Sequence, residues 1–142
     1  MNKNYLIYYI SKIRKKSRHF IEKGLENEGL KGLCSSHGTI LSALYSENRA
    51  LSMKEISKII YRNKSTTSQL VDKLVSGGYV KKTRCRDDGR ISYVVLTDKG
   101  REIQPAFKAI SASLIEKAYE NFSDDETKEL LRLLKKLSTN FS

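Results

Sequence analysis

The sequence is short of several residue types, and each shortage excludes a class of protein. Two cysteines in 142 residues, Cys34 and Cys85, are too few for a disulfide framework and fit a reducing compartment as free thiols. The apolar run near the N-terminus, from Tyr5 to Ile10, has six residues and is too short for a signal peptide core or a membrane span. We therefore expect one cytoplasmic domain with no membrane partner.

Groups typical of catalytic sites are also scarce. His19 and His37 are the two histidines, and the sequence shows no glycine-rich phosphate loop and no recognisable set of nucleophile and base. Cys34 and His37 are three residues apart, which could supply half a zinc site, but no second motif accompanies them. Hydrogen bonding by Ser35 and Ser36 at a helix start explains this region more simply. We predict that the protein is not an enzyme and has no catalytic residues, cofactor or metal.

Acidic residues are few, and the resulting positive charge is unevenly distributed. Sixteen Asp and Glu stand against 27 Lys and Arg, a net charge of +11. Residues 1–31 contribute +5 (eight basic, three acidic) and residues 52–92 contribute +6 (ten basic, four acidic), whereas residues 98–142 hold eight of each. This distribution predicts a surface that faces a polyanion. Double-stranded DNA is favoured as the partner over an anionic membrane.

Apolar spacing and capping residues predict four helices in the first part of the chain. Apolar residues recur at helical intervals over residues 4–24 and again from Ser35 or Ser36 to about Glu47. Within the first of these, "KIRKKSR" at residues 12–18 is interpreted as a solvated face near DNA. A short helix follows Ser52, which forms a capping-box pattern with Glu55. A fourth helix begins near Lys64 and ends at Gly77 and Gly78.

A charged hairpin follows the fourth helix. In "TRCRDDGRISYVVLT", Asp88-Gly89 is a turn signal placed before strand-forming residues. Two short helices joined by about four residues and followed by a basic hairpin predict a helix-turn-helix with a wing. The second of these helices would enter the DNA major groove with its first turns. Its DNA-contacting candidates are Ser65, Thr66, Ser68, Gln69 and Lys73, although a serine and threonine cluster is also good helix-capping chemistry.

The C-terminal part is predicted to be helical. Thr97 can cap a helix, Pro105 predicts a kink or break between Arg101 and Pro105, and Ser123 with Glu126 forms a second capping box. The last helix carries more leucine than one face can bury within a small domain. A second subunit would bury it, using the first and the last two helices; the alternative is that these helices bury one another within a monomer.

The stretch from Leu51 to Gly100 resembles the winged helix-turn-helix of the MarR (multiple antibiotic resistance regulator) transcription factors, and "GLCSSHGTILSAL" is similar to that family's second-helix segment. The resemblance implies a fold that is mainly α with a small β-hairpin wing, a winged helix-turn-helix plus N- and C-terminal dimerisation helices. Residues 1–142 would form a single MarR-like domain, with residues 33–97 as the winged part and residues 1–31 and 98–142 as the dimerisation region. The implied function is that of a ligand-responsive repressor, a homodimer on a pseudo-palindromic operator.

The same resemblance gives the hairpin residues their roles. Arg90 would enter the minor groove, and Asp88 would accept hydrogen bonds from its guanidinium group. Gly89 between them is expected to supply a tight turn. Arg84 and Arg86 are predicted phosphate contacts; the alternative is that they only solvate the loop. A sequence-tolerant architectural protein or a protein-interaction module of the same fold is the alternative, but +6 around the hairpin favours sequence-specific DNA binding.

The signal to which the protein responds has two interpretations. The resemblance places a small aromatic or apolar effector between the dimerising helices and the winged part, where the sequence offers Tyr9, His37, Ile40 and Tyr45. Each of these side chains can instead be a core or dimer contact. The rival interpretation is oxidation of a cysteine, because a helix start at Cys34 and neighbouring arginines at Cys85 both favour a reactive thiolate.

Overall fold

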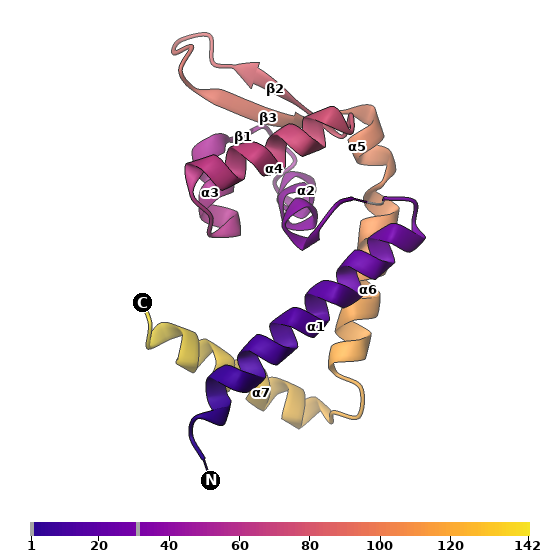
Figure 1. Cartoon of the computed structure of the whole chain (residues 1–142), viewed down its shortest axis with the longest axis vertical. Coiled ribbons are helices and arrows are strands. Elements are labelled where there is room, and N and C mark those ends of the chain that lie inside the picture. Colours follow the sequence, from indigo (N-terminus) through magenta and orange to yellow (C-terminus); the bar gives the residue numbers. More distant parts are fainter. Residues whose placement is uncertain (1, 31) are drawn as a thin grey trace.

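The computed structural model describes residues 2–30 and 32–142, which form seven helices and three strands (Figure 1). The elements in chain order are α1 (Tyr5–Asn27), α2 (Ser35–Glu47), β1 (Leu51–Ser52), α3 (Met53–Ile60), α4 (Lys64–Ser76), β2 (Val80–Arg84), β3 (Ser92–Leu96), α5 (Asp98–Glu102), α6 (Gln104–Ala118) and α7 (Asp124–Thr139). The fold is mainly α with a small antiparallel sheet, as the sequence predicts.

The first helix is longer than predicted. α1 continues through Gly24 to Asn27, and the chain turns afterwards at Gly29, where φ is +77°. Gly24 lies inside the helix, where its lack of a side chain allows close packing. A Cβ at this position would lie 3.2 Å from the Ile110 side chain. α1 and α6 therefore approach closely at this point and diverge towards their other ends (Figure 1).

Side-chain caps fix the helix starts that the sequence indicates. The side chains of Ser52, Thr97 and Ser123 each accept a hydrogen bond from the backbone N–H three residues later. The break before Pro105 is also confirmed, because α5 ends at Glu102 and α6 starts at Gln104. Proline is tolerated in the first turn of α6, where its missing N–H would have no partner within the helix.

The three strands form an antiparallel sheet in the order β1-β3-β2, with Val80 opposite Leu96 and Lys82 opposite Val94. The two-residue strand β1 was not predicted, since it is too short to show alternation. The tight turn assigned to Gly89 is confirmed: the N–H of Ile91 donates to the Asp88 carbonyl at 3.0 Å and closes a four-residue turn over Gly89 and Arg90, without a positive φ at Gly89. This turn lies within a wider hairpin loop, at whose base the N–H of Cys85 donates to the Ile91 carbonyl at 2.8 Å.

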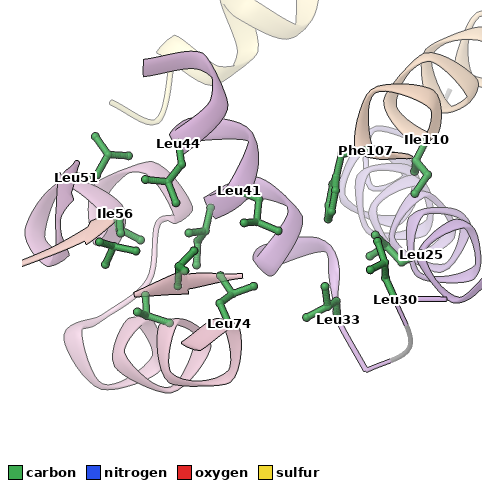
Figure 2. Packing of buried hydrophobic residues seen from close by; sticks show 14 residues of the cluster. Leu25, Leu30, Leu33, Leu41, Leu44, Leu51, Ile56, Leu74, Phe107 and Ile110 are labelled. Atoms are coloured by element: carbon green, nitrogen blue, oxygen red, sulfur yellow. The ribbon is translucent and has the colours of Figure 1, made fainter. Parts of the chain in front are cut away.

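Helix α2 lies in the middle of the hydrophobic core. Figure 2 shows Leu41 and Leu44 facing Leu51, Ile56 and Leu74 of the winged part, while Phe107 and Ile110 of α6 lie on the other side of α2 with a group of leucines. That group consists of Leu25, Leu30 and Leu33. Truncating a fully buried leucine to alanine typically costs about 2–5 kcal/mol. The buried face of α2 thus holds the winged part on α1 and α6.

The two terminal helices leave apolar side chains uncovered. No residue of α7 is buried, and Leu131, Leu133 and Leu134 are about half exposed. The N-terminal half of α1 exposes a further group of large apolar side chains: Tyr5, Leu6, Ile7, Tyr8, Tyr9, Ile10 and Ile13. One copy of the chain therefore does not bury these helices within itself.

Gly100 provides a test of how α5 is seated on the hairpin. A Cβ at this position would overlap the carbonyl oxygen of Tyr79, which also accepts from the N–H of Thr97 at 3.1 Å. Because backbone blocks the methyl group, we expect Gly100→Ala to lower the free energy of unfolding by about 1–3 kcal/mol. Urea denaturation measures this loss. Gly89→Ala is the matched control, since its Cβ would meet nothing within 4 Å; equal stability of the two variants would contradict the packing.

Candidate nucleic-acid interface

A groove of about 720 Å³ lies between α3, the first turns of α4 and the hairpin. Four of its lining residues are cations: Lys54, Lys64, Lys82 and Arg90. The remaining lining residues are small, apolar or aromatic: Ser52, Met53, Ser57, Ser68, Ile91, Ser92 and Tyr93. In Figure 1 the hairpin loop projects on the side where α4 follows α3, which brings Arg90 towards the start of α4.

Two helix N-termini contribute to this groove. Residues from the first turns of α3 and α4 line it, and each of these helices is capped, by Ser52 and Asn63 respectively. The first N–H groups of a helix and its macrodipole favour an anion. Together with the four cations, they give the groove the character of a site for phosphate groups.

The crossing of α3 and α4 is fixed by a buried hydrogen-bond relay. The Ser57 hydroxyl donates to Thr67 Oγ1 at 2.9 Å, and the Thr67 hydroxyl donates to the Asn63 carbonyl at 2.8 Å. Thr67 is completely buried. Because this relay uses Thr67, the first turns of α4 are held rigidly while their other polar side chains stay available.

The predicted recognition residues occupy the accessible side of α4. Ser65 and Gln69 are exposed, and Thr66 and Ser68 are half-buried. The alternative that these hydroxyls cap the helix does not hold, since the cap is the Asn63 side chain, which accepts from the N–H of Thr66 at 2.8 Å. Ser68 lines the groove itself.

Arg90 and Asp88 form the expected ion pair. Arg90 Nε lies 3.1 Å from Asp88 Oδ1, Arg90 Nη2 lies 3.2 Å from Asp88 Oδ2, and the Arg90 backbone N–H donates to Oδ1 at 3.0 Å. The Arg90 side chain and then its backbone N–H lower the pKa of the Asp88 carboxyl group, so it remains ionised. The pair orients a guanidinium group that is 91% exposed.

The other predicted cations lie outside the groove. Arg84 ends β2 and Arg86 lies in the hairpin loop, and both are exposed. Lys73 extends towards Gly32, before α2, so the structure does not bring it together with Arg90. Sequence reasoning missed Lys54 as a site residue and did not select Lys64; their position in the first turns of adjacent helices is the signal that could have identified them. Lys82, which does line the groove, forms an ion pair with Asp72 of α4, with 2.6 Å between Lys82 Nζ and Asp72 Oδ1.

The four predicted effector residues do not form one pocket. His37 and Ile40 are buried, whereas Tyr9 is exposed on the half of α1 that runs away from α2 (Figure 1). Tyr45 alone of the four lines a shallow cleft of about 440 Å³ between α2 and α6. Its hydroxyl donates to the Gly100 carbonyl at 2.6 Å, and burial raises its pKa to about 12, so it remains a neutral phenol. Periodicity placed these residues on helices but could not show how the helices diverge.

The segment "KIRKKSR" is solvated, as predicted, and lies in the middle of α1. Because α1 runs away from α4 and the hairpin (Figure 1), one copy of the chain does not place this segment beside the groove. Across residues 2–30 and 32–142, α1 included, no helix is long and apolar enough to cross a membrane. No group of three potential metal ligands was found in this described part.

The fold and the groove define a winged helix-turn-helix protein, and comparison with known proteins agrees. The profile of the MarR family matches residues 29–91. The SarZ transcriptional regulator of Staphylococcus haemolyticus is 28% identical over 139 residues, covering 96% of this chain and 86% of the relative. These matches, together with the structural ones, indicate a winged-helix transcriptional regulator similar to those of the MarR family.

Two solved structures are similar along nearly the whole chain. A MarR transcriptional regulator from Methanosarcina mazei superposes with a TM-score of 0.83 at 28% identity, covering 99% of this chain and 91% of that one. The MepR–DNA complex from Staphylococcus aureus gives a TM-score of 0.85 at 21% identity, covering 100% of this chain and 99% of that one. At 21% identity, the similarity to the MepR–DNA complex shows a shared fold alone.

Arg90 offers the most direct test of the groove. We expect Arg90→Ala to weaken DNA binding strongly while leaving the melting temperature nearly unchanged, because the side chain is 91% exposed and forms an ion pair with Asp88 at the surface. Fluorescence anisotropy with a labelled duplex measures the affinity. Arg14→Ala removes the same charge from the distant half of α1 and serves as the control. Equal loss in both variants would mean that only the total charge matters.

Proposed function

We propose that the protein is a sequence-specific DNA-binding regulator that acts as a ligand-responsive repressor. The observation that carries this is the groove at which two helix N-termini and four cations converge beside the exposed polar side of α4. α4 would lie in the major groove, with Ser65, Thr66, Ser68 and Gln69 towards base edges. Arg90 would reach the adjacent minor groove.

One DNA strand would run along the groove between α3, α4 and the hairpin. Lys54 and Lys64 are placed to contact phosphates, and the Lys82–Asp72 pair holds the hairpin against α4. Arg84, Arg86 and Lys73 would act at phosphates further along the duplex. Phosphate contacts set the register of the protein on DNA, while base contacts provide the sequence preference.

The active form would be a homodimer built on α1 and α7. Both helices expose apolar side chains that one copy leaves uncovered. The chain also offers complementary charge: residues 12–18 of α1 hold five cations and no acid, whereas residues 116–129, from the end of α6 to the start of α7, hold six acids and two cations. A second copy would cover the apolar faces and bring opposite charges together. Two recognition helices would then read half-sites about 10 bp apart.

The cleft between α2 and α6 would receive the effector. Tyr45 and Phe107 supply aromatic walls, with ring centroids 6.3 Å apart, and Gln104, Lys108 and serines supply polar groups. This composition suits a small aromatic compound, in particular one with a negative group near Lys108. Its occupation would act on the joint between α6 and the winged part through the Tyr45–Gly100 hydrogen bond.

An electrophoretic mobility shift assay separates this proposal from sequence-tolerant DNA coating. A duplex from the region upstream of the protein's own gene is compared with a shuffled duplex of the same composition, at one fixed salt concentration. We expect the specific duplex to bind at least about a thousandfold more tightly. A ratio near one would support the coating alternative.

Base reading and phosphate binding should separate in two variants of α4. We expect Gln69→Ala to relax the preference at a defined base position by about 1–3 kcal/mol. Lys64→Ala should weaken binding evenly across sequences and reduce the slope of log affinity against log salt by about one unit. Binding titrations with single-base variants at several salt concentrations measure both. An unchanged base preference in Gln69→Ala would remove that residue from the reading surface.

The dimer is tested by placing charge on α7. Leu134→Glu should dissociate the homodimer at micromolar concentration, since an unpaired carboxylate in an apolar interface is costly to bury. Sedimentation equilibrium measures the mass. Lys128→Glu, on the same helix, is the control with a change in charge and no loss of an apolar contact. A parent protein that sediments as a monomer would refute the dimer.

A further inference from the structure

The C-terminal end of α4 is held by the segment "LTDKG", which follows the hairpin and begins α5. The three backbone carbonyl groups that come directly after α4 all accept hydrogen bonds from this segment. Lys99 Nζ donates to the Gly77 carbonyl at 2.6 Å. The Thr97 hydroxyl donates to the Gly78 carbonyl, and the Thr97 N–H donates to the Tyr79 carbonyl at 3.1 Å. We call these three hydrogen bonds the α5 clamp.

Lys99 is the charged member of the α5 clamp. Its ammonium group lies at the C-terminal end of α4, where the helix macrodipole favours a cation. The same group lies 4.7 Å from the centre of the Tyr79 ring, in a cation–π contact. The stem of the side chain packs as well, since a Cβ on Gly78 would lie 3.5 Å from Lys99 Cδ. The clamp therefore uses both the charge and the length of this lysine.

Short contacts hold both sides of the α5 clamp in place. On the α5 side, the Gly100 carbonyl accepts from the Tyr45 hydroxyl of α2 at 2.6 Å, and the Gly100 N–H donates to Thr97 Oγ1 at 3.1 Å. On the α4 side, a Cβ on Gly77 would lie 2.6 Å from the Tyr79 ring. The clamp therefore joins the end of α4 to α2 by way of α5.

The α5 clamp lies at the opposite end of α4 from the groove. In Figure 1, α5 adjoins the last turn of α4, whereas the first turns of α4 lie beside α3. The 13 residues of α4 separate its two ends by about 20 Å, which is longer than a lysine side chain. Lys99 is accordingly not among the residues that line the groove.

We propose that Lys99 is a positioning residue that sets the tilt of α4 and thereby the sequence preference of the protein. A helix is stiff, so its tilt is fixed when both of its ends are held. The hydrogen bond of Ser57 with Thr67 holds the start of α4, and the α5 clamp holds its end. Without the Lys99 contact, the last turn is released and the first turns shift against the base edges. Base contacts require close geometry and carry the sequence preference, whereas phosphate contacts do not.

This inference rests on the proposed DNA-binding function and adds a residue to it. Fluorescence anisotropy measures the affinity of the full-length protein for the upstream duplex and for the shuffled duplex, at several salt concentrations. Lys99→Met keeps the length of the side chain but loses the donor and the charge. We expect the ratio of the two affinities to fall about tenfold, the size of one mismatched base pair. The slope of log affinity against log salt should remain that of the parent, since no phosphate contact is lost.

Two further variants make this test specific. Lys99→Arg keeps a cation with N–H donors and should retain the ratio of the parent. Lys23→Met removes the same charge from an exposed position on α1 and serves as the control. A Lys99→Met variant with an unchanged ratio overturns the inference. An equal loss of affinity for both duplexes, with a smaller salt slope, also overturns it, because Lys99 would then be a phosphate contact.

NMR of the free protein tests the α5 clamp without DNA. Lys99 is exposed, so its replacement leaves the core intact. In ¹⁵N spectra, we expect Lys99→Met to shift amide resonances along α4 as far as Ser65 in its first turn, and Lys99→Arg to shift few beyond residue 99. Shifts confined to residues 77–79 and α5 overturn the inference. If the shifts reach Ser65 but the parent protein does not prefer the upstream duplex, the proposed DNA-binding function is refuted instead.

Discussion

The two-sided burial of α2 is the constraint on which the rest of the structure depends. Its leucines pack on α3, α4 and β1 on one side, and its first turn packs on Phe107 and on the end of α1 on the other. A helix that is apolar on two sides cannot be satisfied by one layer of neighbours. The winged part therefore shares one core with α1 and α6, and a movement between them involves α2.

Electrostatics divides the molecule in a second way. The positive charge near α3, α4 and the hairpin converges on a groove with two helix N-termini, whereas the positive charge of α1 lies far from it. The first set suits the phosphates of DNA, and in the proposed homodimer the second would meet the acidic stretch at the end of α6 and the start of α7. A net charge of +11 is thus divided between two separate surfaces.

Local signals in the sequence were sufficient to predict where most helices begin and end. Capping residues such as Ser52 and Ser123, and the proline at residue 105, act within one turn of the chain, and each marks the boundary that the structure shows. Prediction failed where a residue's role depends on a distant partner. Gly24 looked like a helix end, but it lies inside the continuous helix α1 and accommodates Ile110 of α6.

The same distinction applies to the site. The ion pair of Asp88 with Arg90 spans two residues and could be predicted, but the convergence of Lys54 and Lys64 on one groove depends on how α3 crosses α4. Tyr9 is likewise separated from the other three predicted effector residues by the divergence of α1 from α2, while His37 and Ile40 are buried in the core and only Tyr45 lines the cleft. Helix periodicity gives the face on which a residue lies, and tertiary packing decides what that face meets.

The central claim is that DNA lies in the groove between α3, α4 and the hairpin. A titration of ¹⁵N-labelled protein with the upstream duplex, followed by NMR, tests it residue by residue. The account predicts that amide shifts concentrate at the starts of α3 and α4 and in the hairpin loop around Arg90, with little change in residues 12–18. Shifts concentrated in residues 12–18, with the groove unaffected, would contradict it.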